Sequence, residues 1–460
     1  MKLRVSFSLV IFALLFTNLC YAQVIDYNFL GGGARARAMG GAFFAVSDDP
    51  SAGSWNPAGL AQLDLPQTNL TLYSGRVKIE HGLGSLSTEA KMSNDLILSG
   101  GVAIPFKVSG YQMVGCVSYE RLSIFSDQSY YASIDRSEET NGNVNAVTVS
   151  LGRELIKGLS LGMAVNIYSG GYTFKAFQAD RPFKIGVSDT VWSDTVFSYH
   201  PLMEANYSGF NLQFGAMYKI QGLSFGAVVK TPLTLKEKID AQMERDLIVG
   251  GLVNPSRNRP YGALYNAENK WKLPLIWGIG SAFRTGNLII AADVEYRDFS
   301  KAELTYQDAY LPNMNSPTKT IDLGWEKGTQ FRIGGEYIVH TKFGKVPIRV
   351  GYRSDPKVFT SMADIVAEID TITNDGSKMG QLKYTDAGKK VDRIEGNVIS
   401  FGTGIGWKQI MFDVTYEYSK YDYTLSGTVT DGQRSVVDAP FEDKVTNKDS
   451  RLMFNFTGYF

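Results

Sequence analysis

The sequence has only two cysteines and three histidines in 460 residues. Cys20 lies in a segment that we expect to be removed, so Cys116 would remain alone and could form no internal disulfide, zinc site or iron–sulfur site. His81, His200 and His340 lie far apart, and no metal-ligand spacing or Ser–His pairing accompanies them. The sequence therefore predicts no enzyme activity, no metal and no cofactor.

An excess of one charge and long apolar runs are also lacking. Lys and Arg number 46, as do Asp and Glu, so the net charge indicates no basic face for nucleic acid. After the N-terminus, no run of about 18 apolar residues occurs, which excludes a helical membrane protein. Glycine (47) far exceeds proline (15), and Tyr and Phe number 25 and 26. This composition fits a β-barrel, whose strands alternate apolar and polar residues.

The N-terminus has the pattern of a secretory signal peptide. A basic start precedes the apolar stretch Phe7–Phe16, which is too short to span a membrane, and Ala22 offers a small residue at a cleavage position. We therefore expect residues 1–22 to be removed. An uncleaved anchor helix and a lipid attached at Cys20 are the alternatives.

From residue 67 onward the sequence alternates with the period of two that marks β-strands. In Leu288–Phe299, for example, Ile290 and Val294 share one face and Asp293 lies on the other. Mid-strand charges beside apolar faces that end in Tyr or Phe suit a polar lumen, a lipid-facing wall and an aromatic girdle. The fourteen candidate strands lie near 67–80, 94–105, 111–124, 143–155, 159–175, 205–219, 223–242, 270–285, 288–304, 329–340, 346–356, 394–407, 409–425 and 450–460.

The connections between these strands alternate in length. Short turns near Ile156–Gly158 and Gln221–Gly222 alternate with long loops such as 176–204 and 243–269. This asymmetry is typical of the periplasmic and extracellular ends of an outer-membrane barrel. The sequence therefore predicts an all-β fold, a 14-stranded antiparallel transmembrane β-barrel over residues 67–460, which must close because lipid leaves no strand edge unpaired.

Residues 23–66 do not alternate and are rich in small side chains. Gly31–Ala42 is almost entirely Gly, Ala and Arg, and Asp49 before Pro50 predicts the start of a short helix that Asn56-Pro57 ends. A compact segment of this kind ahead of a barrel predicts a plug inside the lumen, and a periplasmic extension is the alternative. The glycines do not fit a nucleotide-binding fingerprint, because no strand–helix frame surrounds them.

This N-terminal segment also carries a motif that can be compared with a known family. Arg37 begins Arg-Ala-Met-Gly-Gly-Ala, Asp48-Asp49 follows, and after six intervening residues comes Asn56-Pro57-Ala58. The arrangement resembles the hatch signature of the FadL/TodX-type outer-membrane transporters of hydrophobic compounds. Leu273–Tyr296 and Val346–Pro356 resemble barrel strands of the same family.

The resemblance implies a barrel with an N-terminal hatch in the outer membrane of a Gram-negative bacterium. It implies passive uptake of hydrophobic compounds such as long-chain fatty acids or hydrocarbons, with hatch gating and a lateral exit. The expected partners are then a hydrophobic small-molecule ligand and membrane lipid, and no nucleic acid. The alternative, within the same superfamily, is a PorV-like barrel that binds protein partners as an adaptor in type IX secretion.

The lateral opening of that family involves a kink in the third strand. The third candidate strand here, 111–124, contains Gly115 and no proline. Gly100-Gly101 and Gly170-Gly171 offer alternative weak points in the wall, because glycine weakens a strand.

Charged residues recur on the predicted lumen face. Our hypothesis is that they form a ring that pins the hatch through Arg35, Arg37, Asp48 and Asp49, next to the Asn56-Pro57 turn, and that one arginine holds a carboxylate ligand. The alternative is a lumen network that pairs only with itself. The candidate lumen residues are Asp293, Glu295, Arg297, Arg332, Glu336, Arg349, Arg353, Asp413 and Glu417.

Overall fold

The computed structural model describes most of the chain. The described residues are 29–81, 87–91, 96–131, 136–179, 183–188, 191–249, 252–253, 259–307, 318–323, 325–357, 367–370, 381–384, 394–429 and 439–460. The predicted signal peptide, residues 1–22, and the first residues of the predicted hatch lie outside this part of the chain.

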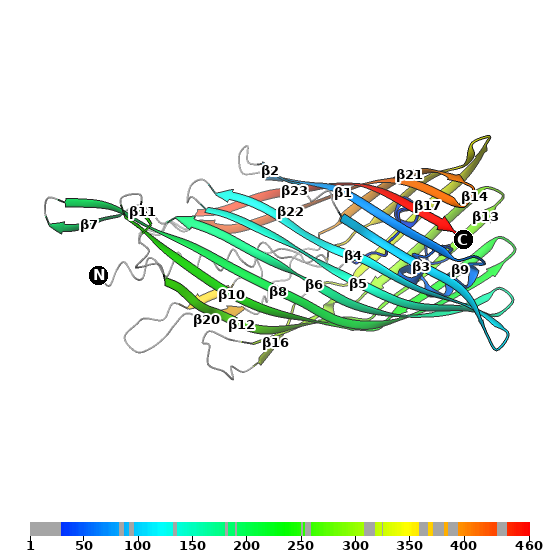
Figure 1. Cartoon of the computed structure of the whole chain (residues 1–460), viewed down its shortest axis with the longest axis horizontal. Coiled ribbons are helices and arrows are strands. Elements are labelled where there is room, and N and C mark those ends of the chain that lie inside the picture. The colour runs from blue at the N-terminus through cyan, green and yellow to red at the C-terminus, as the bar shows by residue number, and fades with distance from the viewer. Residues whose placement is uncertain are drawn as a thin grey trace.

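The strands form one closed antiparallel barrel of 14 strand paths (Figure 1). Short turns join neighbours at one end, which we call the turn end, and longer connections lie at the other, the loop end. Gln67 in the first strand lies opposite Ala103 of the second path and opposite Tyr459 of the last strand. These two ladders close the sheet, so the predicted fold class is confirmed.

The strand bounds follow the order of the paths around the barrel. They are β1 (Gln67–His81); β2 (Ser87–Lys91) with β3 (Leu96–Val108); β4 (Tyr111–Tyr131); β5 (Arg136–Ile156); β6 (Leu159–Ala179) with β7 (Phe183–Ser188); β8 (Val191–Ile220); β9 (Leu223–Lys230) with β10 (Leu233–Val249); β12 (Arg259–Leu273) with β13 (Ile276–Thr285); β14 (Leu288–Arg297) with β15 (Glu303–Gln307); β16 (Thr318–Asp322) with β17 (Gly328–Thr341); β18 (Gly344–Ser354); β21 (Gly396–Trp407); β22 (Ile410–Val429); and β23 (Ala439–Tyr459). Short β11 (Leu252–Val253) pairs with the end of β10, and β19 (Ala367–Asp370) pairs with β20 (Gln381–Tyr384) as a separate sheet.

Several strands extend farther toward the loop end than the sequence predicts. β8 begins at Val191 rather than near 205, so the predicted loop over 176–204 is too long. β8 and β10 remain paired from Ser208 opposite Lys236 to Thr195 opposite Val249, and Lys236, Lys238 and Asp240 are exposed on the outer face of β10 within this stretch. The physical reason is that backbone pairing does not require the lipid-facing pattern from which the strand ends were predicted.

Three predicted strands are also interrupted. The predicted strands 223–242, 270–285 and 288–304 are each divided in two, between β9 and β10, β12 and β13, and β14 and β15. Pro232 and Pro274 lie in the first two gaps and have no N–H group to donate to a ladder.

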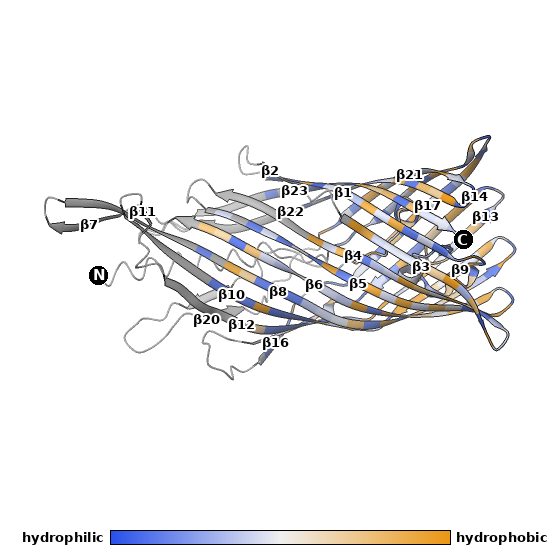
Figure 2. Ribbon diagram, in the orientation of Figure 1, coloured by the Kyte–Doolittle hydropathy of each residue, from blue (hydrophilic) through white to orange (hydrophobic). Residues whose placement is uncertain are grey.

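The two faces of the wall differ as the alternation predicts. Outward-facing Ile290 and Phe331 are 47% and 56% exposed, whereas inward-facing Asp293 and Arg332 are each 2% exposed. Figure 2 shows apolar residues recurring along the strands of the turn-end half. Such an outer face is typical of a lipid-facing wall. Among the described residues, no helix is both long enough and apolar enough to cross a membrane.

Toward the loop end the two faces exchange their character. In β10, Leu235 and Ile239 are buried on the inner face, while Lys236 and Lys238 are exposed on the outer face. In β9, the preceding segment of the same path, Phe225 faces outward and is 48% exposed. The apolar outer face therefore ends near the junction of β9 and β10, beyond which the barrel has an apolar interior and a polar exterior on this strand path.

Residues 29–66, which we call the hatch, fold inside the turn-end half of the barrel (Figure 1). They form α2 (Ala34–Ala38), α3 (Ala52–Trp55) and the 3-10 helix η1 (Pro57–Gln62). The helix predicted after Asp49 is present, but its N-cap residue is Ser51. Asp49 Oδ1 instead accepts hydrogen bonds from the backbone N–H and the hydroxyl of Ser51.

Candidate functional site

Arg35 of the hatch belongs to a buried ion-pair network with the barrel wall. Its Nε and Nη2 donate to the two carboxylate oxygens of Glu336, both at 2.9 Å. Glu336 also accepts from Arg349 Nε at 2.6 Å, and Arg349 Nη1 donates to Asp413 at 2.6 Å. Arg35 pairs with Asp48 as well. The bidentate contact fixes the orientation of the guanidinium as well as its position.

A second hatch arginine, Arg37, lies closer to the loop end. Its Nη1 is 3.6 Å from Glu417 Oε2, and its Nε donates to the carbonyl of Gly31 at 3.1 Å. Glu417 Oε1 in turn accepts from Arg353 Nη1 at 2.5 Å. Such partners are needed because an unpaired charge buried away from water is strongly destabilising.

Strand β14 holds the hatch backbone. Asp293 Oδ2 accepts hydrogen bonds from the backbone N–H groups of Phe43 and Phe44, at 2.7 and 2.9 Å. Two residues along the strand, Glu295 pairs with Arg297 and with Arg332, whose Nη2 lies 3.0 Å from Glu295 Oε2. Successive inward positions on one strand therefore serve different partners.

Asn56 joins the second half of the hatch to the wall. Its Nδ2 donates to the carbonyl of Phe44 at 2.7 Å and to the carbonyl of Ala216 in β8 at 3.1 Å. Its Oδ1 accepts from the backbone N–H of Ala58 at 3.1 Å. Pro57 follows at the first position of η1, where the missing N–H has no intrahelical partner to lose.

Two paired wall glycines allow the hatch backbone to lie directly against the strands. Gly334 in β17 lies opposite Gly351 in β18. A side chain at Gly334 would overlap the carbonyl oxygen of Met39, and one at Gly351 would overlap the backbone nitrogen of Gly40. The close approach therefore depends on the absence of a Cβ at these positions.

The two adjacent hatch aspartates have different environments. Burial by itself would raise the pKa of Asp48, but the guanidinium groups of Arg35 and Arg284 hold that pKa below its ordinary value. Arg284 Nη2 lies 2.9 Å from Asp48 Oδ2. Burial raises the pKa of Asp49, and Arg35 and Ser51 offset only part of that effect. Asp48 therefore links the hatch to the wall as a charged group, whereas Asp49 organises the start of α3.

Beyond the hatch, toward the loop end, one side of the inner wall is apolar. Phe29, the first described hatch residue, stacks on Tyr168 with ring centroids 6.2 Å apart. Strands β17, β18 and β22, on the other side, carry Arg332, Arg353 and Glu417. The apolar sector, as we call it, consists of Val144, Ala146, Tyr168, Tyr172, Phe174, Ala176, Ala205, Tyr207, Leu233, Leu235, Ile239, Leu273 and Phe299.

Four neighbouring strand paths are interrupted at one level of the wall. Pairing of β9 with β13 stops where Lys230 lies opposite Ile276, and pairing of β10 with β12 begins where Leu233 lies opposite Leu273. The four gaps, which together we call the ladder break, are 231–232, 274–275, 298–302 and 323–327.

The ladder break meets the apolar sector. Leu233, Leu273 and Phe299 belong to that sector and lie in or beside the gaps, Phe299 within the short helix η3 (Phe299–Lys301). Trp325, in the last gap, stacks on Trp271 at 6.4 Å between ring centroids and meets Phe299 edge-on at 6.2 Å. Aromatic side chains therefore cover the inner side of the break.

The glycines named as weak points do not interrupt the wall. Gly115, Gly100 and Gly170 each lie opposite a residue on both neighbouring strands, as do Gly101 and Gly171. Glycine keeps its N–H and can remain in a ladder, whereas proline cannot donate. This difference accounts for the two gaps that contain a proline, at Pro232 and Pro274.

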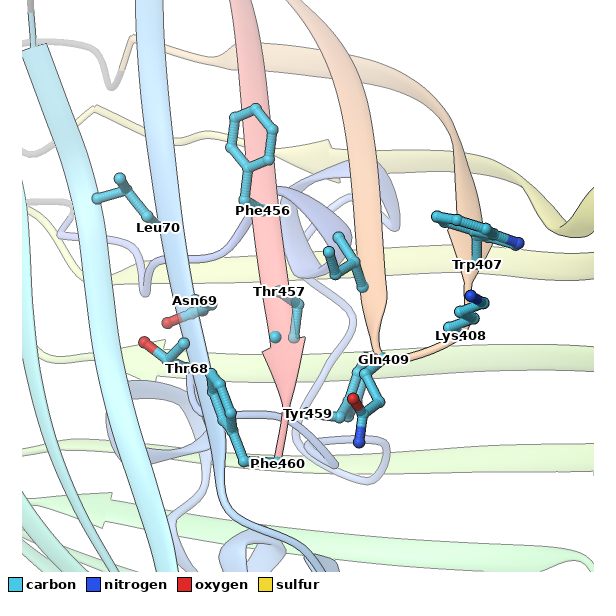
Figure 3. A pocket seen from close by; sticks show the side chains of 12 residues that line it. Thr68, Asn69, Leu70, Trp407, Lys408, Gln409, Phe456, Thr457, Tyr459 and Phe460 are labelled. Carbon is cyan, nitrogen blue, oxygen red and sulfur yellow. The ribbon is translucent and has the colours of Figure 1, made fainter.

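A hollow of about 530 Å³ lies at the turn end, along the seam between β1 and β23. Figure 3 shows Leu70 and Phe456 on these two strands, with Trp407 and Lys408 at the neighbouring turn. Trp407 and the terminal Phe460 are 60% and 69% exposed. The hollow therefore presents apolar side chains at the outer rim of the barrel.

All nine candidate lumen residues are buried on the inner face. Of these, Asp293, Glu336 and Glu417 contact the hatch through the bonds given above. Arg297 Nη2 donates to the carbonyl of Phe29 at 3.0 Å, and the guanidinium of Arg332 lies over the rings of Phe44 and Trp55. Alternation in the sequence did not identify Arg284, which pairs with Asp48 of the hatch. It also did not identify Gln213, whose Nε2 donates to the hatch carbonyls of Ser54 and Trp55 at 3.2 and 3.0 Å. Alternation identifies inward side chains, but it contains no signal for which of them the hatch reaches.

The described residues show no arrangement for metal chemistry. No group of three or more His, Cys, Asp or Glu side chains in this part of the chain could hold a metal ion. Cys116 is buried, and its Sγ lies 3.4 Å from the carbonyl oxygen of Pro50 in the hatch. The thiol therefore contributes to packing between the wall and the hatch.

Comparison with known proteins gives one family match. The family model described as BamG matches residues 9–380, which is more than half of the chain. No curated protein matches the chain.

Several solved structures share the fold. A Pseudomonas aeruginosa FadL homologue is 15% identical, with a TM-score of 0.56 over 94% of this chain and 99% of that one. The Ralstonia pickettii toluene transporter TbuX is 13% identical, with a TM-score of 0.56 over 94% and 100%. The P. putida toluene transporter TodX is 13% identical, with a TM-score of 0.55 over 94% and 99%. At these identities the likeness establishes the fold alone.

Proposed function

The chain belongs to the BamG family, and on the geometry of its inner wall we propose that it is an outer-membrane channel for hydrophobic compounds. Uptake would be passive, and the solute class includes long-chain fatty acids and hydrocarbons. The hatch would gate the turn-end half of the lumen. The solute would leave sideways into lipid through the ladder break.

The observation that carries this proposal is the contact between the apolar sector and the ladder break. The apolar sector offers a hydrophobic solute a surface on which it displaces water, which is the main source of binding free energy for such a solute. The turn-end half of the lumen contains the hatch, whose buried ion pairs oppose an axial path. At the ladder break, by contrast, the wall has gaps in its pairing and borders the apolar outer face.

The fold likeness adds support. TodX and TbuX, which share the fold, are described as toluene transporters. A solute of that kind enters lipid readily, so a sideways exit serves it better than a continuous water-filled pore.

Uptake across an intact outer membrane tests the function. We expect cells that express the chain to take up radiolabelled dodecanol faster than cells without it, with no change for the hydrophilic trisaccharide raffinose. Leu235→Asp places a charge in the apolar sector and should abolish the gain, whereas Thr234→Asp, one residue away on the exposed outer face, should retain it. Heat-dependent mobility on gels would verify that both variants fold. Equal dodecanol uptake with and without the chain would refute the proposal.

The hollow at the seam favours a second candidate function, that of a protein adaptor. Exposed apolar side chains gathered at one place on the rim are typical of a surface that binds a partner. A photo-crosslinking residue in place of Ile410, in the hollow, should then form a protein adduct in cells. The same residue in place of Phe331 is the control, because both side chains are 56% exposed but Phe331 lies outside the hollow. Adducts with lipid alone at both positions would exclude this function.

A further inference from the structure

A buried carboxylate stands in the apolar sector. Glu237 lies on the inner face of β10, is 5% exposed, and lies opposite Tyr207 of β8 and Asn269 of β12. The neighbouring lysines of the strand, Lys236 and Lys238, point outward. The carboxylate is therefore presented on the inner wall between Leu235 and Ile239.

Neutral donors hold this carboxylate in place. Oε1 accepts from the hydroxyl of Tyr207 at 2.9 Å and faces that of Tyr172 at 3.4 Å. Oε2 accepts from Asn269 Nδ2 and from Trp271 Nε1, both at 3.0 Å. Four donors from three strand paths thus orient the group, and none of them carries a charge.

Glu237 differs in this respect from the carboxylates around the hatch. Glu336 and Glu417 pair with arginines, and Asp293 holds the hatch backbone. For Glu237, no Lys, Arg or His side chain among the described residues lies within 4.0 Å. Burying a carboxylate without a cation is costly, so a cation bound beside Glu237 would stabilise its ionised form.

The surroundings suit an organic cation. The rings of Tyr172 and Tyr207 lie 5.9 Å apart, and those of Trp271 and Trp325 lie 6.4 Å apart. The faces of such rings attract an ammonium group, most strongly where water is excluded. The apolar sector that surrounds them would take an alkyl chain. A carboxylate headgroup, by contrast, would be repelled by Glu237.

We propose that Glu237 and the aromatic residues Tyr172, Tyr207 and Trp271 form a site for the headgroup of a hydrophobic cation, an alkylamine or alkylammonium compound. The inference rests on the proposed channel function and narrows its solute class: the channel selects hydrophobic cations over fatty acids of the same chain length.

Binding of three matched probes tests this selectivity. The full-length barrel in lipid nanodiscs is titrated with dodecyltrimethylammonium, dodecanol and dodecanoate, each below its micelle concentration. Tryptophan fluorescence, to which Trp271 and Trp325 contribute, reports binding after subtraction of nanodiscs without protein. We expect the cation to bind roughly tenfold more tightly than dodecanoate, as an ion pair reinforced by aromatic contacts would give. This comparison uses the wild-type chain and does not depend on how any variant folds.

Removing the charge of Glu237 then tests whether this residue causes the preference for the cation. Glu237→Gln should weaken cation binding roughly tenfold and leave dodecanol binding unchanged. Asp240→Asn, an exposed carboxylate on the outer face of the same strand, should bind all three probes as the wild type does. Tighter binding of dodecanoate than of the cation, or an unchanged cation-to-anion ratio in Glu237→Gln, would overturn the inference while leaving the channel intact. Binding of none of the three probes would overturn the channel function as well.

Discussion

Asp293 Oδ2 lies 2.7 Å from the backbone nitrogen of Phe43, 250 residues earlier in the chain. The same oxygen accepts from the backbone N–H of Phe44. One wall carboxylate therefore satisfies two successive backbone donors of the hatch. The position of the hatch in the lumen can be tested through this residue.

Asp293→Ala should loosen the hatch. The substitution leaves two buried N–H groups without their acceptor, at a cost of roughly 1–3 kcal/mol for each. We expect faster leakage of a small fluorescent dye from liposomes that contain the variant. Asp293→Asn keeps one acceptor oxygen and should leak less than Asp293→Ala. Leakage equal to wild type in both variants would show that the hatch does not depend on this bond.

The two hatch aspartates should differ when each is replaced by alanine. Asp48→Ala removes ion pairs to Arg35 and to Arg284 of the wall, so we expect increased dye leakage. Asp49→Ala removes mainly the hydrogen bonds to Ser51 and should leak much less. The same liposome assay compares them. A larger effect from Asp49 than from Asp48 would contradict the assignment of the wall contact to Asp48.

The adjacent glycines Gly334 and Gly335 in β17 can test whether the hatch backbone packs directly against the wall, because only Gly334 faces the hatch. Gly334→Ala places a methyl group against the carbonyl of Met39, so the hatch or the strand must shift. At Gly335 the nearest atom to an added Cβ, outside its chain neighbours, is the carbonyl oxygen of Ile289 at 3.5 Å, an ordinary contact. We expect Gly334→Ala to lower the unfolding temperature of the barrel and Gly335→Ala to leave it nearly unchanged. Thermal unfolding followed by gel mobility provides the measurement, and equal unfolding temperatures would count against direct packing.

The aromatic cover of the ladder break should limit sideways exit. The double variant Phe299→Ala and Trp325→Ala removes ring contacts on the inner side of the break. We therefore expect faster uptake of radiolabelled dodecanol by cells that express this variant. Phe331→Ala removes an aromatic ring from the outer face of β17 and serves as the control. If the double variant and the control take up the probe equally fast, the exit does not lie at the ladder break.

The contacts from the wall to the hatch and the contacts within the wall form one network. A ring that pins the hatch and a lumen network that pairs with itself therefore share residues. Glu336 belongs to both, because it pairs with Arg35 of the hatch and with Arg349 of the neighbouring strand. Alternation alone cannot distinguish these two arrangements, because it predicts that a side chain faces the lumen but not which residue it contacts.

The local pattern of the sequence is sufficient to predict the barrel, its strand number and the face on which each mid-strand residue lies. Period-two alternation fixes these features because successive side chains point to opposite sides of a strand. It also indicated the compact segment before the barrel, through its small residues and its Asn56-Pro57 turn. Asp293, Arg332 and Glu336 are accordingly on the inner face, as expected.

Which distant groups meet depends on how the strands pair and close. Pro232 and Pro274 are visible in the sequence, yet only strand register aligns their gaps with 298–302 and 323–327 at one level. Glu237 reads as an ordinary polar residue in an alternating strand until the pairing of β8, β10 and β12 surrounds it with neutral donors. The physical reason is that closure and register set contacts between strands, whereas the local pattern sets only the face on which a residue lies.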